Sequence, residues 1–154
     1  MTQQGYLIEY SSFKLNSGLL TAIQTIGYVH ATPVQEGVIS PSLRGQDIIA
    51  SAKTGSGKTA AFLIPLIEKS LKGQVVESNH AHSLILVPTR ELALQIAENV
   101  KELCQNVDVS YTAIFGGVKV NPQMQRLRPG VDILIATPGR LLDLHHQGAI
   151  KFGK

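Results

Sequence analysis

The residues with the clearest capacity for chemistry lie in one short segment, ASAKTGSGKTAAF, at positions 50–62. Gly55 and Gly57 let the backbone turn so that its N–H groups face inward and form a concavity for an anion. Lys58 supplies a mobile positive charge for β- and γ-phosphates, and the hydroxyl of Thr59 can ligate Mg²⁺. The segment is therefore predicted to be a phosphate-binding loop (P-loop) that holds a nucleotide.

The flanks of this loop agree with the interpretation. Asp47–Ala50 is predicted to be a short buried strand, and a helix is predicted to begin near Gly57 with its positive dipole end at the loop. Ala52 departs from the usual G-x-x-x-x-G-K-T pattern, and a Gly/Ser turn that happens to precede a lysine is the alternative. The residues expected to hold the nucleotide phosphates are Ala52, Lys53, Thr54, Gly55, Ser56, Gly57, Lys58 and Thr59.

The composition is that of a globular domain. The chain has 154 residues, of which 44% are hydrophobic and 16% charged, which fits one domain with a core. A single cysteine allows no internal disulfide and suits a reducing cytosol, so a cytoplasmic location is expected. No N-terminal stretch resembles a signal peptide, and no apolar run approaches the length of a membrane span. The net charge of +3 favours polyanionic partners slightly but decides nothing by itself.

Strands alternate with helices along the chain. Strands are predicted at 83–87, 111–115 and 132–136, and helices at 90–105 and from 137 to near 148. This alternation predicts an α/β fold with a parallel sheet.

Four segments follow predicted strands directly, so they are expected to share the carboxyl edge of that sheet, where ligands bind. They are the P-loop, Pro88-Thr89-Arg90, Gly116-Gly117 and Thr137-Pro138-Gly139-Arg140. Taken singly, each is ordinary capping or turn chemistry. Together they predict a groove for a second, extended phosphate polymer, held through its backbone without reading its sequence.

In this groove Thr89 and Thr137 are candidate helix caps that leave free N–H groups for an anion. Arg90 and Arg140 add fork-shaped donors suited to phosphate oxygens.

These motifs together resemble the first RecA-like domain of DEAD-box ATP-dependent RNA helicases over nearly the whole chain. ASAKTGSGKT is similar to motif I of that family, where alanine at position 52 is normal, and PTRELALQ at 88–95 is similar to motif Ia. Gly116-Gly117 resembles the GG motif and TPGR at 137–140 resembles motif Ib. The resemblance implies a RecA-like P-loop NTPase fold, ATP and Mg²⁺ as cofactors, a catalytic role for Lys58 and a magnesium ligand in Thr59. It also implies RNA-backbone contacts by Pro88, Thr89, Arg90, Gly116, Gly117, Thr137, Gly139 and Arg140.

The stretch GYVHATPVQ at 27–35 resembles the adenine-reading Q motif of the same family. There Gln35 would bind the N6 and N7 edge of adenine, because its amide offers both a donor and an acceptor. Thr32-x-x-Gln35 also fits a capping box, in which the glutamine only bonds the cap backbone; the family match favours adenine. Tyr10 lies seventeen residues before Gly27, where the family usually has a phenylalanine that stacks on the base. Phe13 is a competing candidate with the wrong spacing.

The family's Asp-Glu-Ala-Asp and Ser-Ala-Thr motifs and its second domain with an arginine finger do not occur in this sequence. The chain is therefore expected to be a partial first RecA-like domain (1–154), incomplete at its C-terminal end. An adenine-recognition segment would span 1–35, and a P-loop and RNA-groove segment 36–154. Family topology places the missing strands beside the P-loop strand, so a gap in the sheet is expected. The full-length protein would couple ATP hydrolysis to separation of RNA duplexes, and this chain alone is predicted to be inactive.

Two other classes of function are alternatives for a chain with a P-loop. A P-loop kinase or GTPase would need a substrate or base-specificity motif, and the Asn-Lys-x-Asp guanine signature is absent from the sequence. A pure nucleotide-binding or RNA-binding module is the non-enzymatic alternative, and it would describe this chain literally if nothing followed residue 154 in the cell. RNA and a second RecA-like domain are the partners that the resemblance implies.

Overall fold

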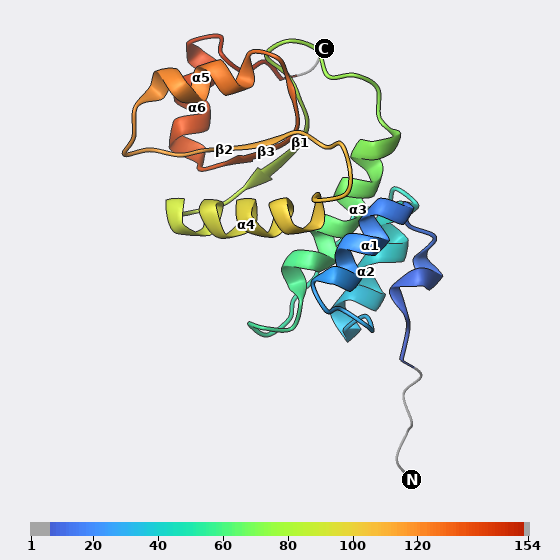
Figure 1. The fold of residues 1–154 in the computed structure, drawn as a ribbon. Helices are drawn as coiled ribbons and strands as arrows, with labels where there is room; N and C mark the ends of the chain where they lie inside the picture. Colours follow the sequence, from blue (N-terminus) through green and yellow to red (C-terminus); the bar gives the residue numbers. More distant parts are fainter. Residues whose placement is uncertain (1–6, 153–154) are drawn as a thin grey trace. The chain divides into compact units, whose positions relative to one another are not determined.

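The computed structural model of the chain describes residues 7–152, which divide into two compact units (Figure 1). The first unit contains the residues up to Lys69 together with Glu102–Val107. The second contains Ser70–Lys101 and the residues from Asp108 onward. The P-loop and the Q-motif segment thus belong to the first unit, and the three other predicted contact segments belong to the second.

The first unit is built from short helices. They are the 3-10 helix η1 (Tyr10–Phe13), α1 (Ser17–Thr25), α2 (Pro33–Leu43) and most of α3 (Lys58–Lys72). Asn16 caps α1 as a side-chain acceptor for the N–H of Gly18 at 2.8 Å, as expected for asparagine before a helix. Apolar side chains of α1, α2 and α3 form the buried interior, notably Leu19, Ile23, Ile39, Leu63, Ile64 and Ile67.

A short backbone pairing joins the start of this unit to the segment before α2. The N–H of Ala31 donates to the carbonyl of Ile8 at 2.8 Å, and Glu9 and His30 form an isolated antiparallel bridge. This pairing fixes η1 beside the beginning of α2, although the two are far apart in sequence.

The predicted strand Asp47–Ala50 is wrong. These residues have no regular secondary structure, and Ile49 is fully exposed instead of buried. A strand exists only where a neighbouring strand satisfies its backbone groups, and residues 47–50 pair with none of the strands in the described chain. The gap that family topology implies in the sheet stays a prediction.

The second unit contains a three-stranded parallel sheet in the order β1-β3-β2. The strands are β1 (Ala81–Leu86), β2 (Tyr111–Ile114) and β3 (Val131–Ala136), close to the predicted ranges. In the register, Ala136 of β3 lies opposite both Leu86 of β1 and Ile114 of β2. All three strands therefore end at the same level.

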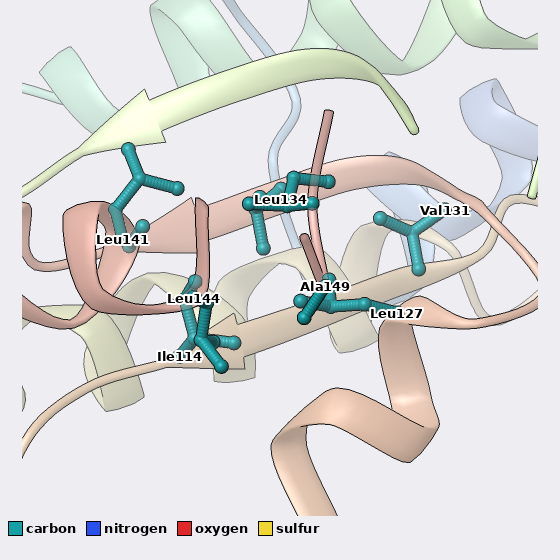
Figure 2. Close-up of a cluster of buried hydrophobic side chains, with 9 residues drawn as sticks. Ile114, Leu127, Val131, Leu134, Leu141, Leu144 and Ala149 are labelled. Carbon is teal, nitrogen blue, oxygen red and sulfur yellow. The ribbon is translucent and has the colours of Figure 1, made fainter. Parts of the chain in front are cut away.

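Helices cover both faces of this sheet. The helices α5 (Val120–Leu127) and α6 (Pro138–His146) lie on one side of the strands, and α4 (Arg90–Leu103) lies on the other (Figure 1). Figure 2 shows the core beneath α5 and α6, where side chains from the central strand meet those of the two helices. The buried members of this cluster are Ile114, Leu127, Val131, Leu134, Ala136, Leu141, Leu144, Ala149 and Ile150.

The edge strand β1 is only partly buried. Ile85 and the following Val87 are buried, but Leu84 is 38% and Leu86 57% exposed. Leu84 pairs with Leu134 and so shares the face that α5 and α6 cover. The fully buried strand residues of the cluster under these helices come from β2 and β3. From β1 the partly buried Ala81 packs against it, while Leu84 and Leu86 stay accessible to solvent.

Asp132 holds the three strands together at their amino ends. Its carboxylate accepts hydrogen bonds from the N–H and the hydroxyl of Ser110, both at 2.8 Å, just before β2. The same hydroxyl accepts from the N–H of Asp132 at 2.9 Å, and His82 of β1 lies 3.3 Å from the other carboxylate oxygen. One side chain of β3 thus contacts both neighbouring strands.

We expect Asp132→Ala to lower the free energy of unfolding by about 1–3 kcal/mol, because it leaves the Ser110 donors without a charged acceptor. Urea unfolding followed by circular dichroism measures this. Asp108→Ala, which removes an exposed carboxylate two residues before Ser110, is the matched control and should cost less than about 0.5 kcal/mol. Equal losses for the two variants would show that Asp132 does not hold the strands.

Candidate functional site

The P-loop has the predicted local form. Gly55 and Gly57 have φ values of 79° and 87°, a backbone region that side chains other than glycine rarely adopt. The N–H of Ser56 donates to the carbonyl of Lys53 at 3.2 Å and closes a turn, and α3 begins at Lys58. The loop therefore leads directly into a helix N-terminus, where the first N–H groups have no partners within the helix.

Lys58 lies across this loop. Its ammonium group donates to the carbonyl oxygen of Ala52, and its side chain is exposed. A phosphate oxygen carries more negative charge than a carbonyl and makes a stronger hydrogen bond to an ammonium group. Lys58 can thus exchange the carbonyl for a phosphate without leaving the loop, and Thr59 places a hydroxyl in the same first turn of α3.

The side chain of Gln35 connects the Q-motif segment to the P-loop. It is 2% exposed, and its Nε2 donates to the carbonyl of Gly57 at 3.2 Å. Its Oε1 accepts from the N–H of Thr32 at 3.0 Å and from the hydroxyl of Tyr10. The cap bond considered in the sequence analysis is therefore present, and the same amide also contacts the phosphate loop. Recognition of adenine by Gln35 stays a prediction.

Gly57 is required at this contact for a second reason besides its φ. A Cβ atom on Gly57 would lie 2.5 Å from Gln35 Nε2 and 3.1 Å from the Thr32 hydroxyl oxygen. A side chain here would therefore displace the Gln35 amide from its position beside the P-loop.

Tyr10 is placed by this network in a buried position. It is 3% exposed, and its ring centroid lies 6.3 Å from those of both Phe13 and Tyr28. Burial, with a smaller contribution from the nearby Tyr28, raises the pKa of Tyr10 to about 12, although the hydrogen bond to Gln35 acts in the opposite direction. Stacking of Tyr10 on a base stays a prediction, since the ring is already packed against two aromatic neighbours.

In the second unit, the loops after the three strands do share one edge. The loop after β3 lies in the middle, because β3 is the central strand, and the loops after β1 and β2 flank it. The hydroxyl of Thr89 accepts from the N–H of Leu92 at 3.2 Å, which confirms the predicted cap of α4. Thr137 occupies the cap position of α6, but its side chain makes no cap hydrogen bond; here Pro138 at the first helical position sets the start of the helix.

Arg90 and the glycine pair lie together at this edge. The guanidinium of Arg90 lies 5.1 Å from the centroid of the Phe115 ring, a cation–π contact that holds an exposed arginine in place. Gly117 has a φ of 78°, and a Cβ there would lie 3.8 Å from an Arg90 nitrogen. The edge therefore presents a held positive charge beside a backbone turn that requires glycine.

Arg140 is more strongly engaged than the sequence predicted. Its guanidinium donates to Gln123 Oε1 at 3.0 Å and to the carbonyl of Val118 at 3.1 Å, and it lies 3.7 Å from Asp143. Its side chain is 12% exposed. Arg140 thus fixes the loop that follows Gly117, and direct contact with a phosphate stays a prediction.

Gln123 is a positioning residue that was not predicted from the sequence. It is buried, its Nε2 donates to the carbonyl of Phe115 at 3.1 Å, and its Oε1 receives Arg140. The available signal was a polar residue on the apolar side of α5, next to Met124 and one turn from Val120 and Leu127.

The prediction that the P-loop shares this edge stays a prediction, because residues 47–50 form no strand of this sheet.

A glycine-turned loop that enters a helix, combined with a parallel sheet whose loops gather at one edge, defines a P-loop α/β protein. Comparison with known proteins identifies the family within this class. Residues 32–153 match the family model described as DEAD/DEAH box helicase. The chain belongs to this family.

Several relatives and solved structures are similar to the chain. It is 42% identical over 136 residues to the probable ATP-dependent RNA helicase ddx18 of Dictyostelium discoideum, which covers 88% of the chain and 23% of that protein. It is 37% identical to the ATP-dependent RNA helicase CshA of Listeria monocytogenes, covering 94% of the chain and 27% of that protein. A crystal structure of a DEAD box protein from Methanococcus jannaschii matches with a TM-score of 0.82 and 38% identity, over 95% of the chain and 39% of that structure. The chain thus spans about a quarter of the length of these curated relatives.

This match confirms the predicted fold class, a helix-flanked parallel sheet similar to the RecA-like domain of DEAD-box proteins. Among residues 7–152, none of the helices has the length and apolar character that crossing a membrane requires.

The environment of Tyr10 predicts a pH effect. A pKa raised to about 12 in the fold, against about 10 in the unfolded chain, favours the neutral phenol. The contribution of Tyr10 to the free energy of unfolding is therefore complete below pH 10 and is lost as the pH rises toward 12. In an absorbance titration of tyrosinate, Tyr10→Phe should abolish the step near pH 12. A late step that persists in this variant would assign it to another tyrosine.

Proposed function

We propose that this chain is the ATP-binding and RNA-backbone-binding part of an ATP-dependent RNA helicase of the DEAD-box type. The observation that carries the proposal is the hydrogen bond from Gln35 Nε2 to the carbonyl of Gly57. It holds the base-reading segment against the phosphate loop, so that one nucleotide can be bound by both. The names of the similar proteins support ATP and RNA as the ligands.

The residues of the P-loop suit ATP with Mg²⁺. Lys58 would hold the β- and γ-phosphates, and Thr59 would offer its hydroxyl to the metal ion, which neutralises phosphate charge when bound. The N–H groups of Lys53, Thr54, Gly55, Ser56 and Gly57 would surround the phosphates. Lys58 is the catalytic residue of the proposal, because its ammonium would contact the transferred phosphoryl group.

The edge of the sheet in the second unit suits the backbone of RNA. Arg90 would contact a phosphate, Gly116 and Gly117 would let the sugar-phosphate chain approach the main chain, and Thr137 and Gly139 would offer N–H groups at the start of α6. Arg140 would position the loop at Val118, and any of its N–H groups without a protein acceptor would bond to a phosphate. Contacts of this kind bind RNA of any sequence.

Duplex separation and ATP turnover belong to the whole protein. A second RecA-like domain and a cytoplasmic location are part of the same proposal. Family membership argues against a small-molecule kinase or a GTPase. The module alternative describes what this chain does by itself, namely bind nucleotide and RNA without turnover.

Gln35→Ala should weaken ADP binding by about 1–3 kcal/mol, the range for a bidentate base contact. Calorimetric titration of ADP and GDP into the chain measures this, with the exposed Gln46→Ala as control. Because Gln35 also contacts Gly57, the comparison of ADP with GDP distinguishes a contact with the base from an effect on the P-loop. An equal loss for ADP and GDP would mean that Gln35 acts through the P-loop and not on the base.

Arg90→Ala should weaken binding of poly(U) and poly(A) to a similar extent. It should also make log K less steep in log salt by about 0.7, the value for one lost single-strand phosphate contact. Fluorescence anisotropy over a salt series measures both quantities. Arg128→Ala, an exposed arginine just before β3 at the opposite edge of the sheet, is the control. A change in preference between the two polymers with an unchanged slope would rule out a backbone contact.

A further inference from the structure

The oxygen of the Gln35 side chain already has two hydrogen-bond donors. The N–H of Thr32 donates to it at 3.0 Å, and the hydroxyl of Tyr10 is the second donor. An amide oxygen has two lone pairs, so its accepting capacity is filled. Nε2 differs, because it has two N–H bonds and the carbonyl of Gly57 takes one of them.

The surroundings fix which way this amide faces. If the amide were rotated by half a turn, its NH₂ group would face the N–H of Thr32 and its oxygen would face the carbonyl of Gly57. Both contacts would be repulsive. The observed orientation is the one that satisfies all three neighbours, so Oε1 is the atom that faces Tyr10.

Purine bases differ in what they need from such an amide. Adenine presents N7 as an acceptor and the 6-amino group as a donor, so it needs an N–H and a free lone pair. Guanine and hypoxanthine present two acceptors, N7 and O6. In the present state, Gln35 can offer an N–H to N7 of any purine but has no lone pair for the adenine amino group.

One of the two donors must therefore leave before adenine is read in full. The N–H of Thr32 is held by the backbone at the start of α2, three residues from Gln35. The hydroxyl of Tyr10 comes from η1, a separate segment, and can rotate about its C–O bond. The hydroxyl is the donor that can be displaced.

We propose that the Tyr10 hydroxyl is a latch that competes with the 6-amino group of adenine for Gln35 Oε1. Tyr10 thereby lowers both the affinity for adenine nucleotides and the preference for adenine over bases with a 6-oxo group. The proposal rests on the nucleotide-binding function proposed above. It assigns Tyr10 a specificity-determining role that depends on its hydroxyl and not on its ring.

The test is the binding of ADP and of inosine diphosphate, whose base has an oxygen in place of the 6-amino group, to the unmodified chain and to Tyr10→Phe. The phenylalanine keeps the ring and removes the competing donor. ADP should bind about 2- to 10-fold more tightly to the variant, as expected for one net hydrogen bond. Inosine diphosphate should change less than about twofold, so the ratio of the two affinities rises. Partial loss of folded protein would lower both affinities together and leave this ratio unaffected.

Tyr28→Phe is the matched control. Its ring is stacked on Tyr10 at 6.3 Å, and in the described chain its hydroxyl makes no bond to Gln35. The ratio of affinities should stay unchanged in this variant. Weaker or unchanged ADP binding in Tyr10→Phe, or an equal gain for both nucleotides, would overturn the latch while nucleotide binding stands. If the unmodified chain bound neither nucleotide, the proposed function would fail and the latch with it.

Discussion

The parallel pairing of β3 with a strand on each side is the constraint on which the second unit depends. Because β1 and β2 both run parallel to β3 and end level with it, the loops that follow them leave the sheet at one edge. That geometry brings Arg90, the glycine pair and the start of α6 together from segments far apart in sequence. At the other end of the strands, Asp132 makes the contacts that keep this pairing in register.

In the first unit, the buried side-chain amide of Gln35 joins separate segments of the chain. A polar side chain that is 2% exposed must have its hydrogen bonds satisfied inside the protein, because an unsatisfied buried group costs more than a hydrogen bond gains. Gln35 meets this requirement with partners from three segments: η1, the start of α2 and the P-loop. The segment that carries Gln35 and the P-loop are therefore joined through one side chain, so a change of partner at Oε1 also affects the hydrogen bond from Nε2 to Gly57.

The two arginines of the sheet edge differ in how many of their hydrogen-bond donors are already used within the protein. Arg90 is held by the face of an aromatic ring, a contact that leaves its N–H groups available to a ligand. Arg140 has its donors directed to Gln123 and Val118, where it supports the loop beside the glycine pair. Two residues of one type, both at the start of a helix after a strand, thus differ in how much of their chemistry is free.

Local signals in the sequence determined much of this protein. The turn glycines and the lysine of the P-loop, the cap at Thr89 and the apolar runs of the three strands predicted elements that the structure contains, because each depends on neighbours along the chain. The prediction of a strand at 47–50 was wrong, since a strand needs a neighbouring strand that local sequence does not supply. The tertiary structure decided which lone pairs and N–H groups are occupied. Gln35 makes hydrogen bonds with Thr32, Gly57 and Tyr10 at once, and Gln123 bonds to Arg140. Most of these partners meet only when distant segments fold against one another.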